Sequence, residues 1–440
     1  MTRILILGGG FAGLYAALEL DKALKRRRDV EVTLVNRENF FLFTPMLHEI
    51  AASDLDITHI VNPIRKLLHH VRFFHGEVLS IDLTAKCVQV IHGPERHRHD
   101  LPYDHLVIAL GSITNFFGIP GLSEHALTMK SLGDAIHLRN RLIDLLEEAD
   151  FECAVGQRQA LLTIVVAGGG FAGVETIAAV NDFLREAVRY YPHLAADQVR
   201  VVLVHAGPVI LPELGSKLGA YAQRKLGRRK VEFFVNTRVA GVTNRGVRLS
   251  DGTWLACDTL IWTAGTSPHP LIAALPCPRV GGRLVVDEYM EIPDWPGVWA
   301  LGDCAAVQNP RSGEVYPPTA QHAMREGKTL AQNLAAVVDG RPRRPFVFST
   351  LGLLAAIGRR TGVAQILGVT FSGFVAWFLW RTIYLSKLPR FEKKVRVALD
   401  WTLDMFFSKD LVHFMILRPP ATSSPEEDQN AVAQKQGGAG

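Results

Sequence analysis

The six-residue string GGGFAG occurs twice in this chain, at positions 8–13 and again at positions 168–173. Each copy follows a short run of aliphatic and β-branched residues, over 4–7 and 164–167, which is typical of a buried parallel strand. Each copy also precedes an apolar pattern with helical spacing. Strand, glycine turn and helix in this order predict a Rossmann-like unit, so the repeat predicts an α/β fold with two such units.

The glycine spacing within each copy matches the fingerprint of a dinucleotide-binding turn. The first glycine permits a tight turn, the second lets the backbone approach a pyrophosphate, and the third lets the helix pack close to the strand. The phosphates then lie at the helix N-terminus, where free N–H groups favour an anion. The residues expected at the two pyrophosphates are Gly8, Gly10, Phe11, Ala12 and Gly13 in the first copy and Gly168, Gly170, Phe171, Ala172 and Gly173 in the second.

For a single copy, a glycine-rich turn without a ligand is a serious alternative. Two identical copies in matching contexts favour two bound dinucleotides instead. A redox enzyme that passes electrons between a bound flavin and a diffusing nicotinamide uses both. From a different class, a nucleotide-binding redox sensor without turnover would carry the same pair of sites.

The residue at the end of the second strand of each unit normally contacts the ribose, and an acidic residue there bonds its hydroxyls. In the first unit the strand over 30–35 ends at Asn36, with Arg37 beside it, and in the second the strand over 199–204 ends at His205. Neither Asn36 nor His205 is acidic, although Asn36 can still hydrogen-bond a ribose. A histidine ring does not repel a 2′-phosphate as a carboxylate does, so the choice between NADH and NADPH stays open.

Charge and cysteine content exclude several classes of protein. The chain has 48 Lys+Arg and 43 Asp+Glu, a formal surplus of +5 that is too small for a dedicated nucleic-acid binder. Its five cysteines are widely spaced without a CxxC pair, which argues against a disulfide scaffold, a zinc module and a thioredoxin-like motif, and suits a reducing cytosol. The histidines over 92–105 lack the spacing of metal ligands, so we predict a solvated hairpin there and no metal site.

The hydropathy pattern argues against a signal peptide and a spanning helix. Only four apolar residues separate Arg3 from the first glycine motif, which is too short for a signal peptide. No apolar run reaches the roughly 18 residues of a spanning helix, and the longest, over 369–380, is stopped by Arg381. We therefore expect a cytoplasmic body whose contact with a membrane is peripheral.

The positive charge is concentrated near the C-terminus, where residues 341–418 carry 13 Lys+Arg and 4 Asp+Glu. Apolar residues over 391–406 follow helical spacing, Lys393, Lys394 and Arg396 are expected to face head groups, and Trp377 and Trp401 suit the membrane interface. These features predict a module of membrane-surface helices. A helix pair packed on the protein's own core and a dimer surface are the alternatives. Residues 419–440 lack apolar periodicity and are predicted to form a disordered tail.

Six further stretches are similar to segments of one flavoprotein family. They are residues 41–49, 103–112, 259–265, 297–305, 317–323 and 372–381. With the two glycine motifs they make the chain, from Arg3 to Leu417, resemble the two-dinucleotide-binding-domain flavoproteins. Among these it is most similar to type II NADH:quinone oxidoreductase, the non-pumping NADH dehydrogenase. The resemblance implies a bound FAD, NADH or NADPH as substrate and a quinone as acceptor.

The resemblance also implies contacts at the flavin. Asp303 would accept a hydrogen bond from a ribityl hydroxyl, with an N-cap as the alternative. Gln321 and His322 would lie at the flavin ring edge, Gln321 on the quinone side, whereas a packed structural role is the alternative for His322. The other implied contacts are Ala109, Gly111, Gly302 and Ala323 at FAD and Ala264 and Gly265 at the nicotinamide nucleotide.

Two charged residues receive catalytic roles from the resemblance. Glu175 follows the second glycine motif, in the expected first turn of the helix, where the dipole stabilises a carboxylate. The resemblance implies that Glu175 positions the nicotinamide or relays protons, with helix capping as the alternative. Lys387 is a candidate cation at the quinone site, and a lysine that snorkels toward lipid head groups is the alternative.

The sequence thus predicts an α/β flavoprotein with two Rossmann-like dinucleotide-binding domains, the second inserted in the first, and a C-terminal amphipathic membrane-binding helical module. FAD is expected on residues 1–115 and 290–350, NAD(P)H on 116–289, and the module over 351–418. The expected reaction passes a hydride from NADH to FAD and two electrons to a membrane quinone. The expected location is the cytoplasmic face of the inner (plasma) membrane, as part of a respiratory chain.

Other functions stay open at this point. A sulfide:quinone reductase-like flavoprotein would need paired redox cysteines near the flavin, and the intact second glycine motif favours NAD(P)H instead. An NADPH-preferring flavin reductase and a reductase for a soluble carrier are further alternatives, and the C-terminal module argues against the latter. The sequence does not decide which quinone is used, or whether the chain forms a homodimer.

Overall fold

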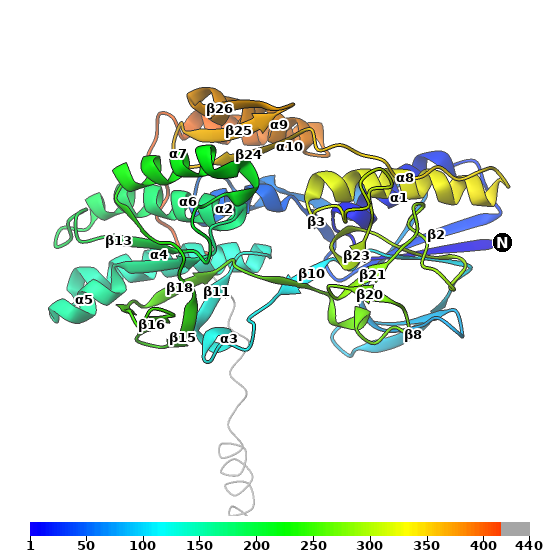
Figure 1. The fold of residues 1–440 in the computed structure, drawn as a ribbon, viewed down its shortest axis with the longest axis horizontal. Coiled ribbons are helices and arrows are strands. Elements are labelled where there is room, and N and C mark those ends of the chain that lie inside the picture. The colour runs from blue at the N-terminus through cyan, green and yellow to red at the C-terminus, as the bar shows by residue number, and fades with distance from the viewer. Residues whose placement is uncertain (415–440) are drawn as a thin grey trace, which may run out of the picture.

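The computed structural model describes residues 1–414, and the predicted tail over 419–440 lies outside them (Figure 1). The first sheet is parallel throughout, with the strand order β22-β9-β1-β2-β5. Its strands are β1 (Thr2–Leu7), β2 (Val30–Asn36), β5 (Arg72–His75), β9 (His105–Ile108) and β22 (Val298–Ala300). The last four residues of β1 are buried, as expected of an aliphatic strand covered on both faces.

Two helices pack together beside this sheet. Helix α1 (Phe11–Ala23) leaves the first glycine motif and lies against α8 (Ala320–Val338). Their closest approach is at Gly327, where an added Cβ would stand 2.4 Å from the carbonyl oxygen of Ala12. A side chain at Gly327 would therefore separate the two helices, so glycine is required at this crossing.

The second sheet is also parallel, with the order β11-β18-β12-β13-β14. Its strands are β11 (Ala126–Thr128), β12 (Thr163–Ala167), β13 (Arg200–Val204), β14 (Val231–Phe234) and β18 (Thr259–Trp262), and the helices around it are α4 (Leu132–Phe151), α5 (Val155–Leu161), α6 (Phe171–Ala187) and α7 (Gly215–Arg228). All five strands lie between β9 and β22 along the chain. The second Rossmann-like domain is therefore inserted in the first, as predicted, and the two form the left and right halves of Figure 1.

Shorter elements connect and cover the two sheets. The antiparallel pair β10 (Ser112–Thr114) and β19 (Thr266–Pro268) runs between the halves. The accessory elements are β3 (Phe40–Leu42), α2 (Leu47–Ala51), β4 (Val61–Pro63), β6 (Glu77–Asp82), β7 (Cys87–His92), β8 (His97–Pro102), α3 (Leu122–His125), β15 (Val239–Thr243), β16 (Gly246–Leu249), β17 (Trp254–Ala256), β20 (Arg279–Val280), β21 (Arg283–Val285) and β23 (Ala305–Ala306). His92, His97 and His99 lie in the hairpin of β7 and β8, where their rings are exposed or half-buried, whereas His105 is half-buried and begins β9 of the first sheet, outside the predicted hairpin.

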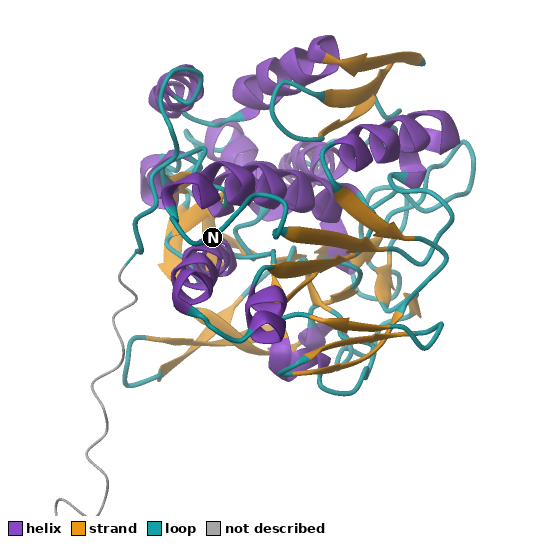
Figure 2. Cartoon of the chain, turned by 90° about the vertical axis from the view of Figure 1, so that its left-hand side faces the viewer, coloured by secondary structure: helices purple, strands orange, loops and turns teal. Residues whose placement is uncertain are grey.

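The C-terminal module contains a sheet as well as the predicted helices. It consists of β24 (Gly352–Ala356), β25 (Gly362–Ile366), β26 (Val369–Gly373), α9 (Phe374–Lys387) and α10 (Phe391–Leu403). The three strands form an antiparallel meander, and α9 packs against it. The module lies over α6 and α7, on one side of the second domain (Figures 1 and 2). The apolar run over 369–380 is thus divided between a strand and a helix. Among the described residues, no helix has the length and apolarity needed to span a bilayer.

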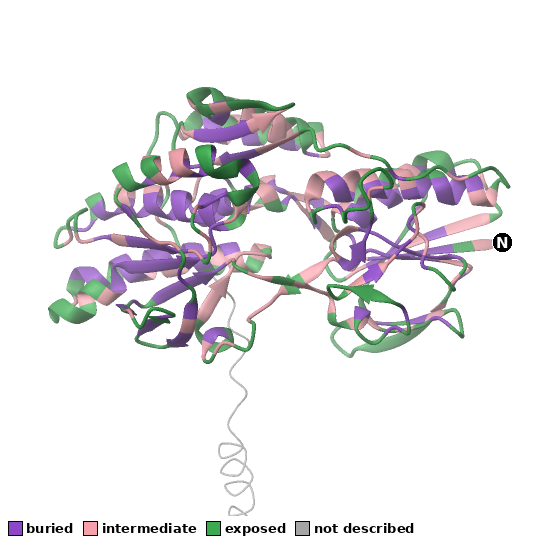
Figure 3. Cartoon of the chain, viewed as in Figure 1, coloured by how far each residue is buried: buried purple, intermediate pink, exposed green. Residues whose placement is uncertain are grey.

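The two module helices are amphipathic, but some of their side chains face inward where the sequence predicted contact with a membrane. Figure 3 marks the exposed residues of the module in green. The large apolar residues among those on the two helices are Phe374, Val375, Phe378, Phe391, Val395, Leu399 and Leu403. Trp377 and Trp401, expected at a membrane interface, are instead buried against the protein. Lys393, expected to face head groups, is also buried, and its Nζ donates to the carbonyl oxygen of Thr58 at 2.5 Å. Of these three, Lys393 and Trp401 join the module to the rest of the protein, through Thr58 and Glu49.

Candidate functional site

The first glycine motif forms an open cradle at the start of α1. Gly8 has φ +101°, and an added Cβ there would stand 2.3 Å from the carbonyl oxygen of Ala109. An added Cβ on Gly13 would stand 1.9 Å from the carbonyl oxygen of Gly8, so the helix packs directly on the turn. By contrast, nothing lies within 4 Å of the Cβ position of Gly10. With no acidic residue in the first turn of α1, the free N–H groups are left to an anion such as a pyrophosphate.

The second glycine motif repeats this geometry at the start of α6. Gly168 has φ +122°, and an added Cβ on Gly173 would stand 1.8 Å from the carbonyl oxygen of Gly168. The space at Gly170 is open again except for Glu213, whose Oε1 is 4.0 Å from the added Cβ. The first turn of α6 also lacks an acidic residue. The residues present in both motifs therefore fit the pyrophosphate of a dinucleotide.

The residue at the tip of the second strand braces each glycine turn. Asn36 Oδ1 accepts a hydrogen bond from Gly9 N at 2.7 Å, and Asn36 Nδ2 donates to the carbonyl oxygen of Glu38 at 2.8 Å. In the second domain, His205 Nδ1 accepts a hydrogen bond from Gly169 N at 3.2 Å. This bond requires an unprotonated Nδ1, and burial lowers the pKa of His205. Both tip residues thus have a role in the turn itself, beyond the predicted ribose contact.

The ends of two neighbouring strands complete each cradle. Ala109 N donates to the carbonyl oxygen of Leu7 at 2.9 Å, which places Ala109 and Gly111 beside the first turn. In the second domain Thr263 N donates to the carbonyl oxygen of Ala167 at 2.9 Å, and this places Ala264 and Gly265 beside the second turn. Carboxyl ends of parallel strands next to a glycine turn form the usual crevice for a dinucleotide.

Asp303 lies in a polar cluster that sequence analysis found only in part. Ser112 Oγ donates to Asp303 Oδ2 at 2.6 Å, and Lys130 Nζ donates to Ser112 Oγ at 2.7 Å. Asp303 makes no side-chain capping bond to the short 3-10 turn Gly302–Cys304 in which it lies, so the N-cap alternative is wrong. Its carboxylate is held in a fixed orientation and half-exposed, which suits a ligand hydroxyl. Desolvation lowers the pKa of Lys130, while Asp303 opposes that shift.

Glu326 supports the same turn from α8 and was not predicted as a site residue. Its Oε2 accepts a hydrogen bond from Gly302 N at 2.8 Å. Burial raises the pKa of Glu326 to about 7, and the hydrogen bond from Gly302 opposes the shift. Glu326 lies on the same buried face of α8 as Ala323, Gly327 and Leu330. A glutamate on an otherwise apolar helix face is the signal in the sequence that could have identified it.

The start of α8 holds Gln321 and His322 in different surroundings. Gln321 is half-buried, and its Nε2 donates to the carbonyl oxygen of Gly352 in the module at 3.2 Å. His322 is buried between the rings of Tyr316 and Phe348, and its Nδ1 lies 2.7 Å from Thr319 Oγ1. Burial lowers the pKa of His322 to about 4. These contacts support the packed structural role for His322, whereas Gln321 lies at the border with the module.

Glu175 lies beyond the first turn of α6, so the predicted first-turn position and the capping alternative are both wrong. Its side chain is buried and faces the module. Oε1 accepts hydrogen bonds from Trp380 Nε1 at 3.0 Å and from Ala356 N at 3.1 Å, and Oε2 lies 3.9 Å from His48 Nδ1. Burial raises the pKa of Glu175 to about 8, although both hydrogen bonds oppose the shift. Glu175 therefore connects the second glycine helix to the C-terminal module.

A second buried glutamate, Glu49, lies close by and was missed as an ionisable residue of the site. Both of its carboxylate oxygens are 3.1 Å from Trp401 Nε1 on α10. Burial raises the pKa of Glu49 to about 8. The sequence places Glu49 between Leu47 and Ile50, and an acid inside such an apolar segment is the available clue.

Lys387 occupies the exposed last turn of α9. Partial burial lowers its pKa, and the positive charges of Arg325, Lys328 and Lys394 add to that shift. Over residues 1–414, no carboxylate forms an ion pair with any of these four cations. Lys387 thus belongs to a positive patch at the edge of the module.

The five cysteines form no disulfide and are all free thiols. Cys304 is buried beside Asp303, and its Sγ lies 3.4 Å from the carbonyl oxygen of Ile108. Cys257 and Cys277 are buried elsewhere, and Cys153 is exposed. The described chain therefore shows no cysteine pair of the kind that sulfide oxidation needs.

The chain was compared with known families and proteins. Residues 2–327 match the model of the pyridine nucleotide-disulphide oxidoreductase family, and residues 351–410 match the NDH2 C-terminal domain. The type II NADH:quinone oxidoreductase Ndh of Mycobacterium tuberculosis is 33% identical, over 91% of this chain and 87% of that protein. A probable NADH dehydrogenase of Dictyostelium discoideum is 30% identical, over 94% of this chain and 91% of that protein.

A solved structure shares the fold. The structure of NDH2 from Plasmodium falciparum in complex with NADH superposes with a TM-score of 0.86 at 20% sequence identity. The superposition covers 93% of this chain and 99% of that chain. The likeness therefore extends over both dinucleotide-binding domains and the C-terminal module.

Proposed function

The chain belongs to the pyridine nucleotide-disulphide oxidoreductases and, among them, to the type II NADH:quinone oxidoreductases, and from this membership we propose how its residues carry the reaction. The enzyme uses FAD to oxidise NADH and to reduce a quinone, without pumping protons. One observation carries the proposal for this chain. The helix of the second glycine cradle holds Glu175, and Glu175 is hydrogen-bonded by the module that follows the two dinucleotide domains.

Each domain is assigned one dinucleotide. Residues 1–115 and 290–350 would hold FAD, with the Gly8–Gly13 turn at its pyrophosphate and Asp303 at a ribityl hydroxyl. Residues 116–289 would hold the nicotinamide nucleotide, with the Gly168–Gly173 turn at its pyrophosphate. When bound, FAD supplies the hydride and electron chemistry, and the protein supplies binding, orientation and electrostatics.

The protein's own groups position the two bound dinucleotides and hold or transfer protons. The two cradles hold their ligands by backbone N–H groups, which fixes the distance between the reacting rings without a paired acid and base. From helix α6, which follows the second glycine turn, Glu175 either positions the nicotinamide or holds a proton for the quinone. A carboxyl group whose pKa is near 8 carries a proton at neutral pH, so the second role fits its surroundings. Gln321 marks the quinone side of the site.

The module is proposed to place the enzyme on a lipid surface, on the cytoplasmic face of the inner (plasma) membrane. Two observations support this. The exposed apolar side chains of α9 and α10 suit the acyl boundary of a bilayer, and Lys387, Lys394 and Arg396 suit its anionic head groups. Because a quinone is apolar, its reductase has to reach it there. A homodimer that covers the face of α10 is the alternative, and the mass of the protein in solution distinguishes the two.

Steady-state oxidation of NADH and of NADPH by the purified yellow protein tests the proposed function. The assay is run with and without a short-chain quinone. NADH consumption that requires quinone is the expected result. If neither nucleotide bleaches the flavin, the proposal fails.

A further inference from the structure

A small polar cavity lies directly behind Glu175. It is enclosed between α2, α6 and the C-terminal module, and its volume of about 50 Å³ has room for water molecules. His48, Glu49, Glu175, Ala179 and Arg381 contribute to its wall. Six carboxyl groups and one imidazole line this space, and all of these carboxyl groups except Glu175 have no part in the hydride transfer described above.

Glu49 is a buried acid of this cavity with few hydrogen-bond partners. Within residues 1–414, the only donor that its carboxylate contacts is the indole N–H of Trp401, which is shared between both oxygens. An ionised carboxylate can accept about four hydrogen bonds, so a charged Glu49 would lack most of its partners. A neutral carboxyl group, or one hydrated from the cavity, fits these surroundings better.

The charged groups that face Glu49 come from several elements. Arg381 of α9 stabilises the carboxylate, and its guanidinium stacks over the ring of Trp401 at 4.7 Å. Asp54, after α2, and Asp404, after α10, destabilise it. The effect of Arg381 on the pKa of Glu49 opposes the effects of the two aspartates. Burial has a larger effect than any of them and raises this pKa. Helix α4 also packs against α2 but directs its buried Arg139 to the ring of Phe414.

His48 and Glu175 continue the cavity inward. The negative charge of an ionised Glu49 adds to the rise in the pKa of Glu175, which burial dominates. His48 lies beside Glu175, with 3.9 Å between Nδ1 and Oε2. Burial lowers the pKa of His48 to about 3, and the charge of Lys409 adds to that effect. His48 is therefore neutral, and its ring can donate one hydrogen bond and accept another.

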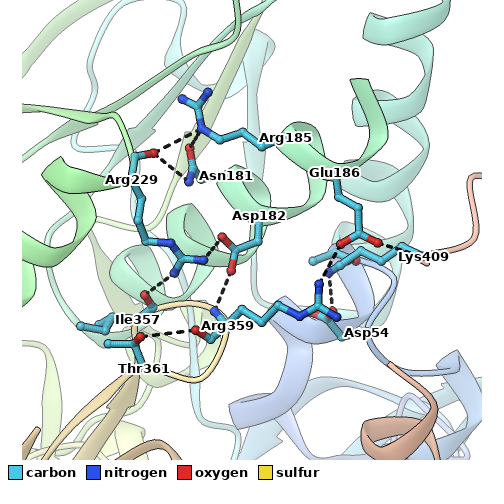
Figure 4. A network of polar contacts seen from close by, with 11 residues as sticks. Asp54, Asn181, Asp182, Arg185, Glu186, Arg229, Ile357, Arg359, Thr361 and Lys409 are labelled. Atoms are coloured by element: carbon cyan, nitrogen blue, oxygen red, sulfur yellow. Dashed lines mark hydrogen bonds and ion pairs between the residues drawn. The ribbon is translucent and has the colours of Figure 1, made fainter. Parts of the chain in front are cut away.

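The cavity and a bowl on the surface share charged residues that belong to the polar network drawn in Figure 4. Asp182, Glu186 and Arg359 line the cavity and also line an open bowl of about 710 Å³ on the surface. The side chains of Asp182 and Glu186 are 15% and 18% exposed. Glu186 accepts hydrogen bonds from Lys409 N at 3.0 Å and from Arg359 Nη1 at 3.3 Å. Polar side chains thus extend from the bowl to Glu49 and Glu175.

The reaction needs a proton from the medium. NADH releases a hydride, which is two electrons and one proton, and a quinone takes up two electrons and two protons to become a hydroquinone. One proton per turnover must therefore come from water. We propose that this proton enters through the cavity behind Glu175 and that Glu49 carries it from the Asp182–Glu186 bowl to Glu175. This inference rests on the proposed function.

The test separates the two half-reactions of the holoenzyme. Glu49→Gln removes the proton carrier at constant size, and Ala179→Leu fills the cavity without removing an ionisable group. Asp150→Asn is the matched control, because Asp150 is a buried acid that contacts His193 and does not line this cavity. Flavin bleaching by NADH under anaerobic conditions follows the first half-reaction, and the return of colour with a short-chain quinone follows the second.

We expect both variants to slow the second half-reaction by roughly 100-fold, the usual size of a proton-transfer effect, with bleaching by NADH and the control unchanged. The infrared band of a protonated carboxyl group should titrate near pH 8 in the parent protein and lose one component in Glu49→Gln.

Unchanged quinone reduction in both variants would overturn the inference, and so would equal slowing of both half-reactions. A parent protein that never reduces quinone would instead refute the proposed function.

Discussion

His205 Nδ1 accepts a hydrogen bond from the backbone N–H of Gly169 at 3.2 Å, in the same place where Asn36 accepts one from Gly9 in the first domain. The two domains thus brace their glycine turns with different side chains. In the second domain the brace is a neutral ring at the position where a carboxylate would meet the ribose. The residue at this position therefore bears on the choice between NADH and NADPH.

Replacing His205 by glutamate should shift that preference. A carboxylate repels a 2′-phosphate, so we expect His205→Glu to lower kcat/KM for NADPH relative to NADH by at least about tenfold. Asn is the matched control, because the first domain shows that it braces the turn without a charge. The measurement is kcat/KM for both nucleotides, and an unchanged ratio in His205→Glu would contradict the prediction.

Glu175 should give quinone reduction a pH dependence. With its pKa raised to about 8 by burial, Glu175 is protonated at neutral pH and loses its proton as the pH rises through about 8. If it supplies a proton, kcat falls above that pH in the parent enzyme. Glu175→Gln should remove this alkaline limb and lower the plateau roughly 100-fold. The exposed Glu124→Gln is the control. An alkaline limb that survives in Glu175→Gln would exclude the role.

Glu326 should affect stability in a pH-dependent way. Its folded-state pKa of about 7 exceeds the unfolded value of 4.5, so the folded protein binds the extra proton between these values. Its contribution to stability is therefore present below about pH 4.5 and is lost as the pH rises through 7. Urea unfolding at pH 5 and pH 8 should show that Glu326→Gln gains about 3 kcal/mol relative to the parent protein over this range. A constant difference would show that burial does not shift this group.

The crossing of α1 and α8 should not tolerate a side chain. Gly327→Ala places a methyl group 2.4 Å from the carbonyl oxygen of Ala12, so we expect a loss of about 1–3 kcal/mol and weaker retention of FAD. Gly156→Ala in α5 is the matched control, because nothing lies within 4 Å of its added Cβ. The control should be neutral or slightly stabilising. Thermal unfolding and flavin absorbance after gel filtration measure both effects.

The exposed face of α10 should be needed for membrane binding. The double variant Phe391→Ser and Leu399→Ser removes two large apolar side chains, each worth about 1.5–3 kcal/mol when buried in an apolar phase. Sedimentation with anionic vesicles should show at least a tenfold loss of binding, with NADH oxidation by a soluble quinone retained. Val155→Ser, an equally exposed site on α5, is the control. Full vesicle binding by the double variant would favour the dimer alternative.

The sequence was sufficient for the dinucleotide-binding architecture because local chemistry determines it. A tight turn, an open backbone and a close helix each require glycine, so Gly8, Gly10 and Gly13 and their repeat predicted both cradles. The aliphatic runs before them predicted β1 and β12 for the same reason. Amphipathic spacing over 391–406 likewise predicted α10, since a helix with one apolar face has a recognisable period.

The sequence was less informative wherever a side chain depends on a distant partner. Glu175 was expected in the first turn of its helix, with helix capping as the alternative, but it bonds Trp380, which lies 205 residues away. Glu49 bonds Trp401, 352 residues away, and Lys393 bonds Thr58. The module sheet was missed because its strands are short and pair only with one another.

The sequence by itself determined that two glycine turns are built for dinucleotides and that a basic, aromatic module follows them. Tertiary structure alone decided that His205 braces its turn, that Trp377 and Trp401 face inward, and that Glu49 and Glu175 share one buried cavity. The physical reason is the range of the interactions. A glycine turn is specified by the conformations of consecutive residues, whereas a buried acid acquires its pKa from groups that only the folded chain brings together.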